Sequence, residues 1–251
     1  MNAQLPLLLR WPAQQRFETF VAGNNGAALA LLRDAATSTA APWVFAAGPA
    51  GSGKTHLLLA ACATATAAGR NAQYLSLATL GDRDEAIRRA SAAPADAIRS
   101  LGGSDLLALD DVHAIAGAAA AEHALFDLYN RAKVEKSTLL FSATAAPAQI
   151  AIALPDLVSR LSACAQARLT PLDDAARRNW LRGRAGARGL TLDDSVLDWL
   201  FAHHARDLSS LADLLERLDR AALAAQRRVT VPFLRAMLDR DSGVRTHENG
   251  F

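Results

Sequence analysis

The sequence predicts an α/β fold in which a parallel-sheet domain with a phosphate-binding loop is followed by a small all-helical domain. Three observations lead to this prediction. A glycine-rich loop joins an apolar run to a helix-forming segment between Trp43 and Ala61. Strand-like apolar runs and helical patterns then alternate as far as Ser142, an order typical of doubly wound sheets. Beyond Leu172 only helical periodicity remains.

The loop after the first predicted strand fits the pattern G-x-x-x-x-G-K-[ST]. It follows the apolar run Trp43–Ala47 and precedes a helix-forming segment. Its glycines let backbone N–H groups turn inward, and these donors form a phosphate cradle with the positive end of the next helix. Lys54 would reach the β- and γ-phosphates, and the Thr55 hydroxyl would bind Mg²⁺. The expected nucleotide contacts are the loop residues and the helical residue after them: Gly48, Gly51, Ser52, Gly53, Lys54, Thr55 and His56.

Two aromatic residues, Phe17 and Phe20, precede the first predicted strand. Packing in the core is the default interpretation for both side chains. Their position also suits a wall for the nucleotide base, which needs apolar contact, so Phe20 is included among the expected nucleotide-binding residues. A helix is expected over Gly26–Arg33, and the small residues of Thr37–Pro42 indicate the loop into the strand.

A pair of carboxylates ends the apolar run Leu106–Asp111. A continuous apolar run is typical of a parallel strand that is buried on both faces. Ligands of open α/β sheets lie outside the carboxyl ends of strands, so both carboxylates should lie beside the phosphate loop. We therefore expect Asp110 to be the Mg²⁺ partner and Asp111 to position water. Strands at Gln73–Leu77 and Thr138–Ser142 extend the predicted sheet, and a polar side chain at the tip of the latter should point toward the γ-phosphate.

The last third of the chain is predicted to be helical. Four segments carry helical periodicity: Asp173–Ala187, Asp193–Ala202, Leu208–Ala225 and Val231–Leu238. Aspartates stand near three of the expected N-termini, where their side chains can accept hydrogen bonds from backbone N–H groups. Ahead of this domain, Leu154–Leu161 is expected to form a short amphipathic helix.

Length and composition favour a helix-rich globular protein. The chain has 251 residues, 51% of them hydrophobic, and its formal net charge of +2 does not by itself favour nucleic acid or membrane as a partner. No apolar run reaches membrane-spanning length and no signal-peptide pattern is present, so we expect a soluble cytoplasmic protein without a membrane partner. Cys62 and Cys164 match no metal-ligand spacing, and His113, His203 and His204 are interpreted as ordinary polar residues.

An apolar hexapeptide lies close to the N-terminus: Gln4, Leu5, Pro6, Leu7, Leu8 and Leu9. Pro6 fixes its own φ and disfavours a helical conformation for Leu5, so the segment should be extended. An extended peptide with one amide and several leucines suits recognition in the groove of a partner. The residues alone leave a second interpretation open, a frayed terminus or a strand laid against the domain.

Several motifs in this order resemble the AAA+ ATPases: the phosphate loop, the Asp110-Asp111 pair, a polar strand tip, an arginine-containing helix and an all-helical lid. Within them the chain is similar to the DnaA-like family, and more closely to its regulatory-inactivator branch, Hda. The likeness spans nearly the whole chain. Phe17–Asn24 resembles the segment that opens the initiator's nucleotide domain, whereas Leu154–Leu161 and Leu214–Asp219 resemble the inactivators.

This resemblance implies roles for particular residues. Arg160 stands where the family carries an arginine finger, Thr144 where it carries the residue called sensor 1, and Gln4–Leu9 where the inactivators carry a peptide for the DNA polymerase III sliding clamp. The implied mechanism is that the nucleotide-bound protein docks on the DNA-loaded clamp, contacts ATP-bound DnaA and promotes hydrolysis of that ATP. An arginine supplied in trans can accelerate such hydrolysis on the order of 10³- to 10⁵-fold. Replication initiation would thereby be switched off, with DNA contacted indirectly through the clamp in the nucleoid.

The resemblance also implies a domain organisation. Residues 1–12 would hold the clamp-binding peptide, 13–168 the AAA+ nucleotide-binding domain and 169–240 the helical lid, and the polar tail 241–251 is expected to be disordered. The implied cofactors are ADP or ATP, with Mg²⁺.

Two departures from the initiators bear on function. Initiators usually carry an arginine, called sensor 2, at the start of the third lid helix, where this chain has Ser209. This favours a bound nucleotide that orders the fold over vigorous hydrolysis at the chain's own site. The chain also ends after the lid, without room for a helix-turn-helix domain, so sequence-specific DNA binding is not expected. An intrinsically active ATPase that acts as a helicase loader, an initiator-like DNA-binding protein and a homo-oligomer remain as alternatives.

Overall fold

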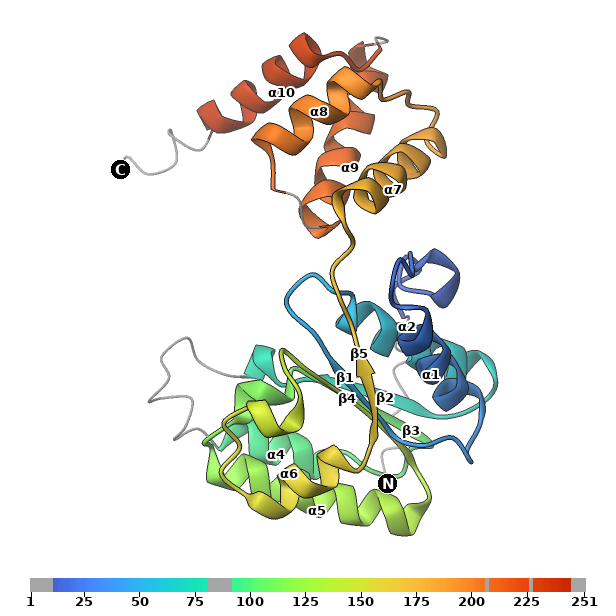
Figure 1. Cartoon of the computed structure of the whole chain (residues 1–251), viewed down its shortest axis with the longest axis vertical. Helices are drawn as coiled ribbons and strands as arrows, with labels where there is room; N and C mark the ends of the chain where they lie inside the picture. Colours follow the sequence, from blue (N-terminus) through green and yellow to red (C-terminus); the bar gives the residue numbers. More distant parts are fainter. Residues whose placement is uncertain (1–10, 81–91, 206–207, 226–227, 245–251) are drawn as a thin grey trace, which may run out of the picture. The chain divides into compact units, whose positions relative to one another are not determined.

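The computed structural model describes residues 11–80, 92–205, 208–225 and 228–244. The chain divides into two compact units between Pro171 and Leu172. Each unit has its own hydrophobic core, and Figure 1 shows a layered α/β unit before this boundary and a bundle of helices after it. The predicted α/β fold with a helical lid is confirmed.

The N-terminal unit is built around a parallel sheet. In the described part of the unit, five strands form this sheet: β1 (Val44–Ala47), β2 (Ala72–Ser76), β3 (Leu106–Asp110), β4 (Thr138–Ala143) and β5 (Ala165–Arg168). Their spatial order is β2-β3-β4-β1-β5, and every neighbouring pair is parallel. Because β3, β4 and β1 are parallel neighbours, the carboxyl ends of these three strands lie at the same edge of the sheet.

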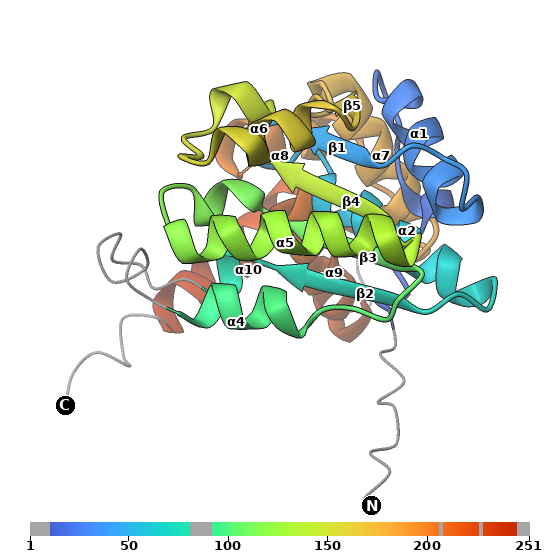
Figure 2. The ribbon, with the colours of Figure 1, turned by 90° about the horizontal axis from the view of Figure 1, so that it is seen from below.

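Helices cover both faces of the sheet (Figure 1). One face packs against α1 (Gly26–Thr37) and α2 (Lys54–Ala67). The other face packs against α4 (Ala93–Ser100), α5 (Ala119–Glu135) and α6 (Pro155–Ser162). Figure 2 shows α5 between α4 and α6 in this second layer.

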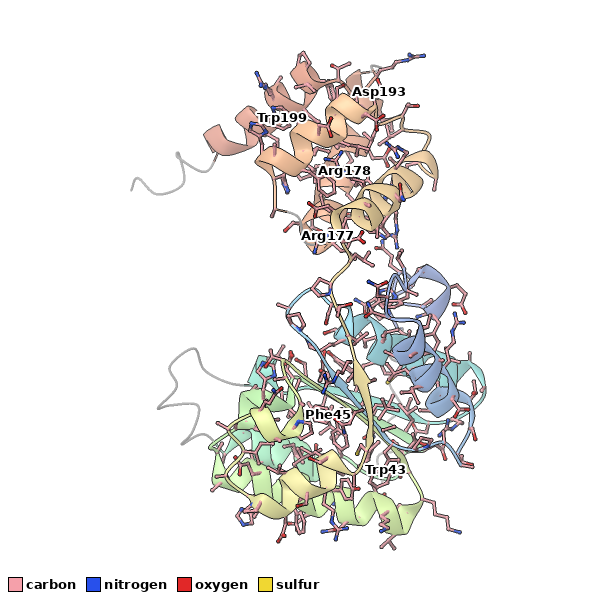
Figure 3. All side chains as sticks on the ribbon, viewed as in Figure 1. Trp43, Phe45, Arg177, Arg178, Asp193 and Trp199 are labelled. Carbon is pink, nitrogen blue, oxygen red and sulfur yellow. The ribbon has the colours of Figure 1, made fainter. Side chains whose placement is uncertain are left out.

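The two cores draw on alternate residues of the same strands, as the pleat of a sheet requires. Phe45 and Phe141 belong to the core shared with α5, whereas Val44 and Leu140 belong to the core shared with α2. Figure 3 shows Phe45 inside the body of this unit. All four side chains are fully buried, which explains why their strands read as continuous apolar runs in the sequence.

The C-terminal unit contains the four helices that the sequence predicts. They are α7 (Asp174–Gly186), α8 (Asp194–His203), α9 (Leu208–Ala225) and α10 (Val231–Val244). The leucine stripe of α9 fills their core with Leu211, Leu214, Leu215 and Leu218. Asp173 caps α7, since its carboxylate accepts a hydrogen bond from the Ala176 backbone N–H at 2.7 Å. The last helix continues to Val244, past the predicted end at Leu238.

The sequence analysis did not predict helix α4 or strand β5. β5 is a four-residue strand at the edge of the sheet, paired only with β1 among the described strands. Its residues Gln166 and Arg168 are exposed, so it lacks the apolar run by which the inner strands were recognised. None of the helices that the structure describes is both long and apolar enough to cross a membrane.

Candidate nucleotide-binding site

The phosphate loop connects β1 to α2 through positions that favour glycine. Gly51 and Gly53 have φ values of +73° and +92°, in the left-handed region. A Cβ on Gly53 would lie 2.6 Å from Cε2 of Phe20, and one on Gly48 would lie 2.4 Å from the carbonyl oxygen of Leu169. A Cβ on Gly51 would meet open space. The loop backbone is therefore closely packed at Gly48 and Gly53 and open at Gly51, which suits a cradle for phosphate.

Two polar side chains in this loop are buried. The Lys54 ammonium donates hydrogen bonds to the carbonyl oxygens of Gly48 at 2.8 Å and Pro49 at 3.0 Å, so it lies against the loop. Burial lowers the pKa of Lys54, and the charges of Asp111 and Asp110 oppose this shift. The Ser52 hydroxyl has no hydrogen-bond partner among the described residues. Buried polar groups normally have partners, so this unpaired hydroxyl fits a site for phosphate oxygens.

Asp110 is the centre of a hydroxyl network at the end of β3. Its carboxylate is 1% exposed. Oδ2 accepts hydrogen bonds from the Thr55 hydroxyl at 2.6 Å and the Tyr74 hydroxyl at 2.8 Å, while Oδ1 accepts one from Ser142. The structure thus brings Thr55 and Asp110, the two expected Mg²⁺ partners, into direct contact.

A hard cation fits this oxygen-rich group. In the described residues no group of three or more His, Cys, Asp or Glu side chains could hold a metal ion. A Mg²⁺ ion at Thr55 and Asp110 would therefore need further oxygens, which nucleotide phosphates and water supply in such sites. The ion would neutralise phosphate charge, and the residues of this chain would orient it.

Asp111 lies at a sharp turn directly after β3. It adopts the left-handed conformation, with φ 59° and ψ 47°, which Asp tolerates better than most residues. Its backbone N–H donates to the Ser142 hydroxyl at 3.0 Å, and its Oδ1 lies 4.0 Å from Nδ1 of His113. Burial and the Asp110 charge raise the pKa of Asp111, whereas His113 and Lys54 lower it. A half-buried carboxylate at this place is suited to orient a water molecule.

The aromatic residues ahead of the first strand have separate positions. Phe17 is 3% exposed and packs in the α2-side core. Phe20 is half-buried and lies against Gly53 of the phosphate loop. Its ring centroid is 5.3 Å from that of His56, whose Nε2 lies 2.9 Å from the Arg16 carbonyl oxygen. Phe20 and His56 thus connect the N-terminal segment to the start of α2, beside the expected phosphate site.

Two expected catalytic residues lie outside this network. Thr144 follows β4 and is exposed, whereas Ser142, inside β4, is the residue that contacts Asp110. Arg160 lies on α6, with its guanidinium carbon 5.8 Å from the centroid of the Tyr129 ring. α6 packs in the layer opposite α2, so Arg160 projects from the other side of the sheet from the helix that follows the phosphate loop.

Sequence reasoning did not identify Tyr74 and Ser142 as site residues. A signal was present, because each is a hydroxyl residue in a strand that neighbours the Asp110 strand. The expected clamp-binding residues Gln4–Leu9 lie outside the described residues.

Comparison with known proteins fits the two-unit organisation. The family model described as the bacterial DnaA ATPase domain matches residues 12–167. The chain belongs to the DnaA-like AAA+ family. A second family model, the lid domain of Hda, matches residues 174–238, which makes this DnaA-like protein one of the Hda type. An uncharacterized protein of Haemophilus influenzae is 34% identical over 240 residues, or 95% of this chain and 100% of that protein.

Solved structures share the fold of this DnaA-like protein. Domain III of the Thermotoga maritima replication initiation protein DnaA has a TM-score of 0.73 at 21% identity, covering 92% of this chain and 98% of that one. The AMPPCP-bound DnaA of Aquifex aeolicus has a TM-score of 0.66 at 20% identity and 82% coverage of this chain. This chain spans 64 to 65% of the length of three such replication-initiator structures. The two family matches support a replication-related role of the Hda type.

Proposed function

We propose that this protein is a nucleotide-bound negative regulator of replication initiation. It docks on the DNA-loaded sliding clamp through Gln4–Leu9 and contacts ATP-bound DnaA. Arg160 then enters the DnaA nucleotide site in trans and promotes hydrolysis of the bound ATP. The observation that carries the proposal is the exposed position of Arg160 on α6, in the layer opposite the chain's own α2.

The setting of Arg160 suits an arginine finger. Leu157 and Leu161 are fully buried under α6, while Arg160 is exposed. Tyr129 lies beneath the guanidinium, and the attraction between the cation and the ring favours this position. No carboxylate of the described residues forms an ion pair with Arg160, so its charge is available to phosphate oxygens, which a guanidinium binds in bidentate fashion.

The chain's own nucleotide has a structural role in this proposal. Lys54, Thr55 and Asp110 hold ADP or ATP with Mg²⁺, and the bound nucleotide orders the loop against Phe20. The AMPPCP bound by DnaA structures of the same fold supports nucleotide binding here. Ser209, at the place of the sensor 2 arginine, supports slow turnover at this site.

The deciding experiment measures how fast DnaA-bound ATP becomes ADP in the presence of clamp-loaded DNA. It compares the native chain, Arg160→Ala, a form lacking residues 1–9, and Arg99→Ala. Arg99 is an exposed arginine of α4 and serves as the matched control. We expect the native chain and Arg99→Ala to accelerate hydrolysis, and the other two forms to fail while retaining nucleotide. Equal rates for all four forms would overturn the proposal.

A second candidate function is intrinsic ATP hydrolysis, as in a helicase loader or an initiator-like protein. The observation that favours it is the proximity of Asp111 to Asp110 and Lys54, which together contain the groups needed for hydrolysis. Measuring turnover by the chain alone separates the two functions. Turnover that Asp111→Asn abolishes, without any effect on DnaA, favours the loader. Tight binding to initiation-site DNA without clamp favours the initiator-like protein.

A further inference from the structure

Glu122 is a buried carboxylate that the nucleotide site does not use. It lies in the first turn of α5 and is 1% exposed. No basic side chain of the described residues forms an ion pair with it. Burying a charge is strongly unfavourable unless hydrogen bonds replace the lost water, so the contacts of this carboxylate are informative.

Backbone N–H groups from two separate segments replace that water. Oε1 accepts a hydrogen bond from Gly117 at 2.7 Å, and Oε2 accepts one from Leu154 at 2.9 Å. The Ala153 N–H donates to both oxygens at 3.0 Å. Hydrogen bonds to a charged acceptor are roughly twice as strong as those between neutral groups, so both segments are firmly held.

One of these two segments is the start of α6, whose own residues provide no side-chain cap. Its N-cap residue, Leu154, has an apolar side chain, and Pro155 at the first helical position has no N–H. In a capping box, a glutamate of the same helix accepts from the N-cap N–H. Here Glu122 of α5 does so instead, and its negative charge also favours the positive end of α6.

The other segment contains Gly117 and follows the carboxylates at the end of β3. Gly117 lies in the connection between η3 (Val112–Ile115), which begins after Asp111, and α5. One side chain thus joins the segment that leaves the nucleotide site to the helix that carries Arg160. Since α6 is only eight residues long, a shift of its first turn would move Arg160 as well.

We propose that Glu122 is a positioning residue for Arg160: it fixes the start of α6 and thereby the direction in which the guanidinium leaves the surface. The proposal rests on the function proposed for Arg160. In this proposal, the position of α6 depends on the contact from Glu122 of α5 and on the connection after Asp111.

The first test measures amide hydrogen exchange in residues 151–162. Glu122→Gln keeps the shape of the side chain but replaces one acceptor oxygen with an NH₂ group, which cannot accept from a backbone N–H. Asp127→Asn is the matched control, because Asp127 is exposed on the same helix and loses the same charge. We expect exchange at Ala153 and Leu154 to rise about tenfold or more in Glu122→Gln, with the control and residues 44–55 unchanged. Unchanged exchange at Ala153 and Leu154 would overturn the inference.

The second test separates positioning from general stability. Maximal stimulation of DnaA-bound ATP hydrolysis should fall about tenfold in Glu122→Gln, while the chain's own nucleotide affinity stays unchanged. In an Arg160→Ala background the same substitution should have no further effect, because both changes act through one guanidinium. Additive losses, or a parallel loss of nucleotide affinity, would mean that Glu122 acts only on the fold and would overturn the inference.

Failure of the proposed function would look different. If Arg160→Ala leaves stimulation intact, the proposed function is wrong, whereas the exchange data still decide whether Glu122 fixes α6. If Glu122→Gln does not fold, Glu122→Asp takes its place, because it keeps the charge but shortens the reach to Leu154.

Discussion

The Tyr74 hydroxyl donates a hydrogen bond to Oδ2 of Asp110 at 2.8 Å, across the boundary between β2 and β3. The same oxygen accepts a hydrogen bond from the Thr55 hydroxyl, which follows the phosphate loop. One carboxylate atom therefore connects the edge strand β2 to the expected Mg²⁺ site. Burial and the charge of Asp110 raise the pKa of Tyr74. The phenol therefore keeps its proton across the physiological range and acts as a donor.

Tyr74→Phe should destabilise the protein and weaken its dependence on Mg²⁺. The substitution removes a donor to a buried carboxylate, and hydrogen bonds to charged groups contribute about 1.5–3 kcal/mol. We expect the free energy of unfolding to fall by about 1–3 kcal/mol. Mg²⁺ should also increase nucleotide affinity less than in the native chain, because Asp110 is less well oriented.

Denaturant unfolding and nucleotide titrations with and without Mg²⁺ measure these two effects. Tyr129→Phe is the natural control, since Tyr129 is the second of the chain's two tyrosines and lies in the opposite helical layer. A Tyr74→Phe protein with native Mg²⁺ dependence would show that this hydrogen bond does not orient Asp110.

Gly53→Ala should impair nucleotide binding more than Gly51→Ala does. Both positions have a left-handed φ, so alanine costs about 1–2 kcal/mol at either one. Only at Gly53 does the added Cβ also collide with the Phe20 ring, at 2.6 Å. Nucleotide affinity should therefore drop further in Gly53→Ala, and an additional Phe20→Ala substitution should remove the part due to the collision. Equal losses for the two glycine variants would show that the Phe20 contact is unimportant.

The phosphate loop and the inner strands could be predicted because their signals are local. A run such as Leu106–Asp110 is apolar throughout, since the strand is buried on both faces, and the glycine-rich loop follows a fixed spacing. β5 could not be recognised, because an edge strand with exposed Gln166 and Arg168 reads like a loop.

The contacts of the site depend on which strands become neighbours. Ser142 and Tyr74 reach Asp110 because β3 lies between β4 and β2. The sequence pattern of one strand does not predict which side chains of neighbouring strands it will contact. The family resemblance placed the polar residue of the strand tip at Thr144, which is exposed. Glu122 is a similar case, since its burial follows from the packing of α6 on α5. The roles assigned to Arg160 and the clamp peptide stay predictions.

Asp173→Ala should destabilise the helical unit more than Asp193→Ala does. Both aspartates occupy the N-cap position of a lid helix, but only the Asp173 side chain accepts a capping hydrogen bond, from Ala176. Loss of such a cap costs about 0.5–2 kcal/mol. Asp193, labelled in Figure 3, makes no side-chain cap and is a control of the same chemistry. Unfolding monitored by helical circular dichroism measures the difference, and equal losses would contradict the capping interpretation.

Cys62 and Cys164 should be unreactive in the native protein and should make its stability fall at high pH. Burial raises the pKa of both thiols from 9.0 to about 12. Because the thiolate is the nucleophile, a thiol reagent at about pH 8 should label neither residue until the chain unfolds.

A pKa that is higher in the folded than in the unfolded state contributes stability that is fully present below pH 9.0 and lost as pH rises toward about 12. Each thiol should thus remove roughly 1 kcal/mol for each pH unit in this window. Unfolding titrations of the native chain and a Cys62→Ala, Cys164→Ala variant at about pH 8 and about pH 10.5 measure this loss, and the variant should show a smaller one. Rapid labelling of the folded chain would contradict the burial of these thiols.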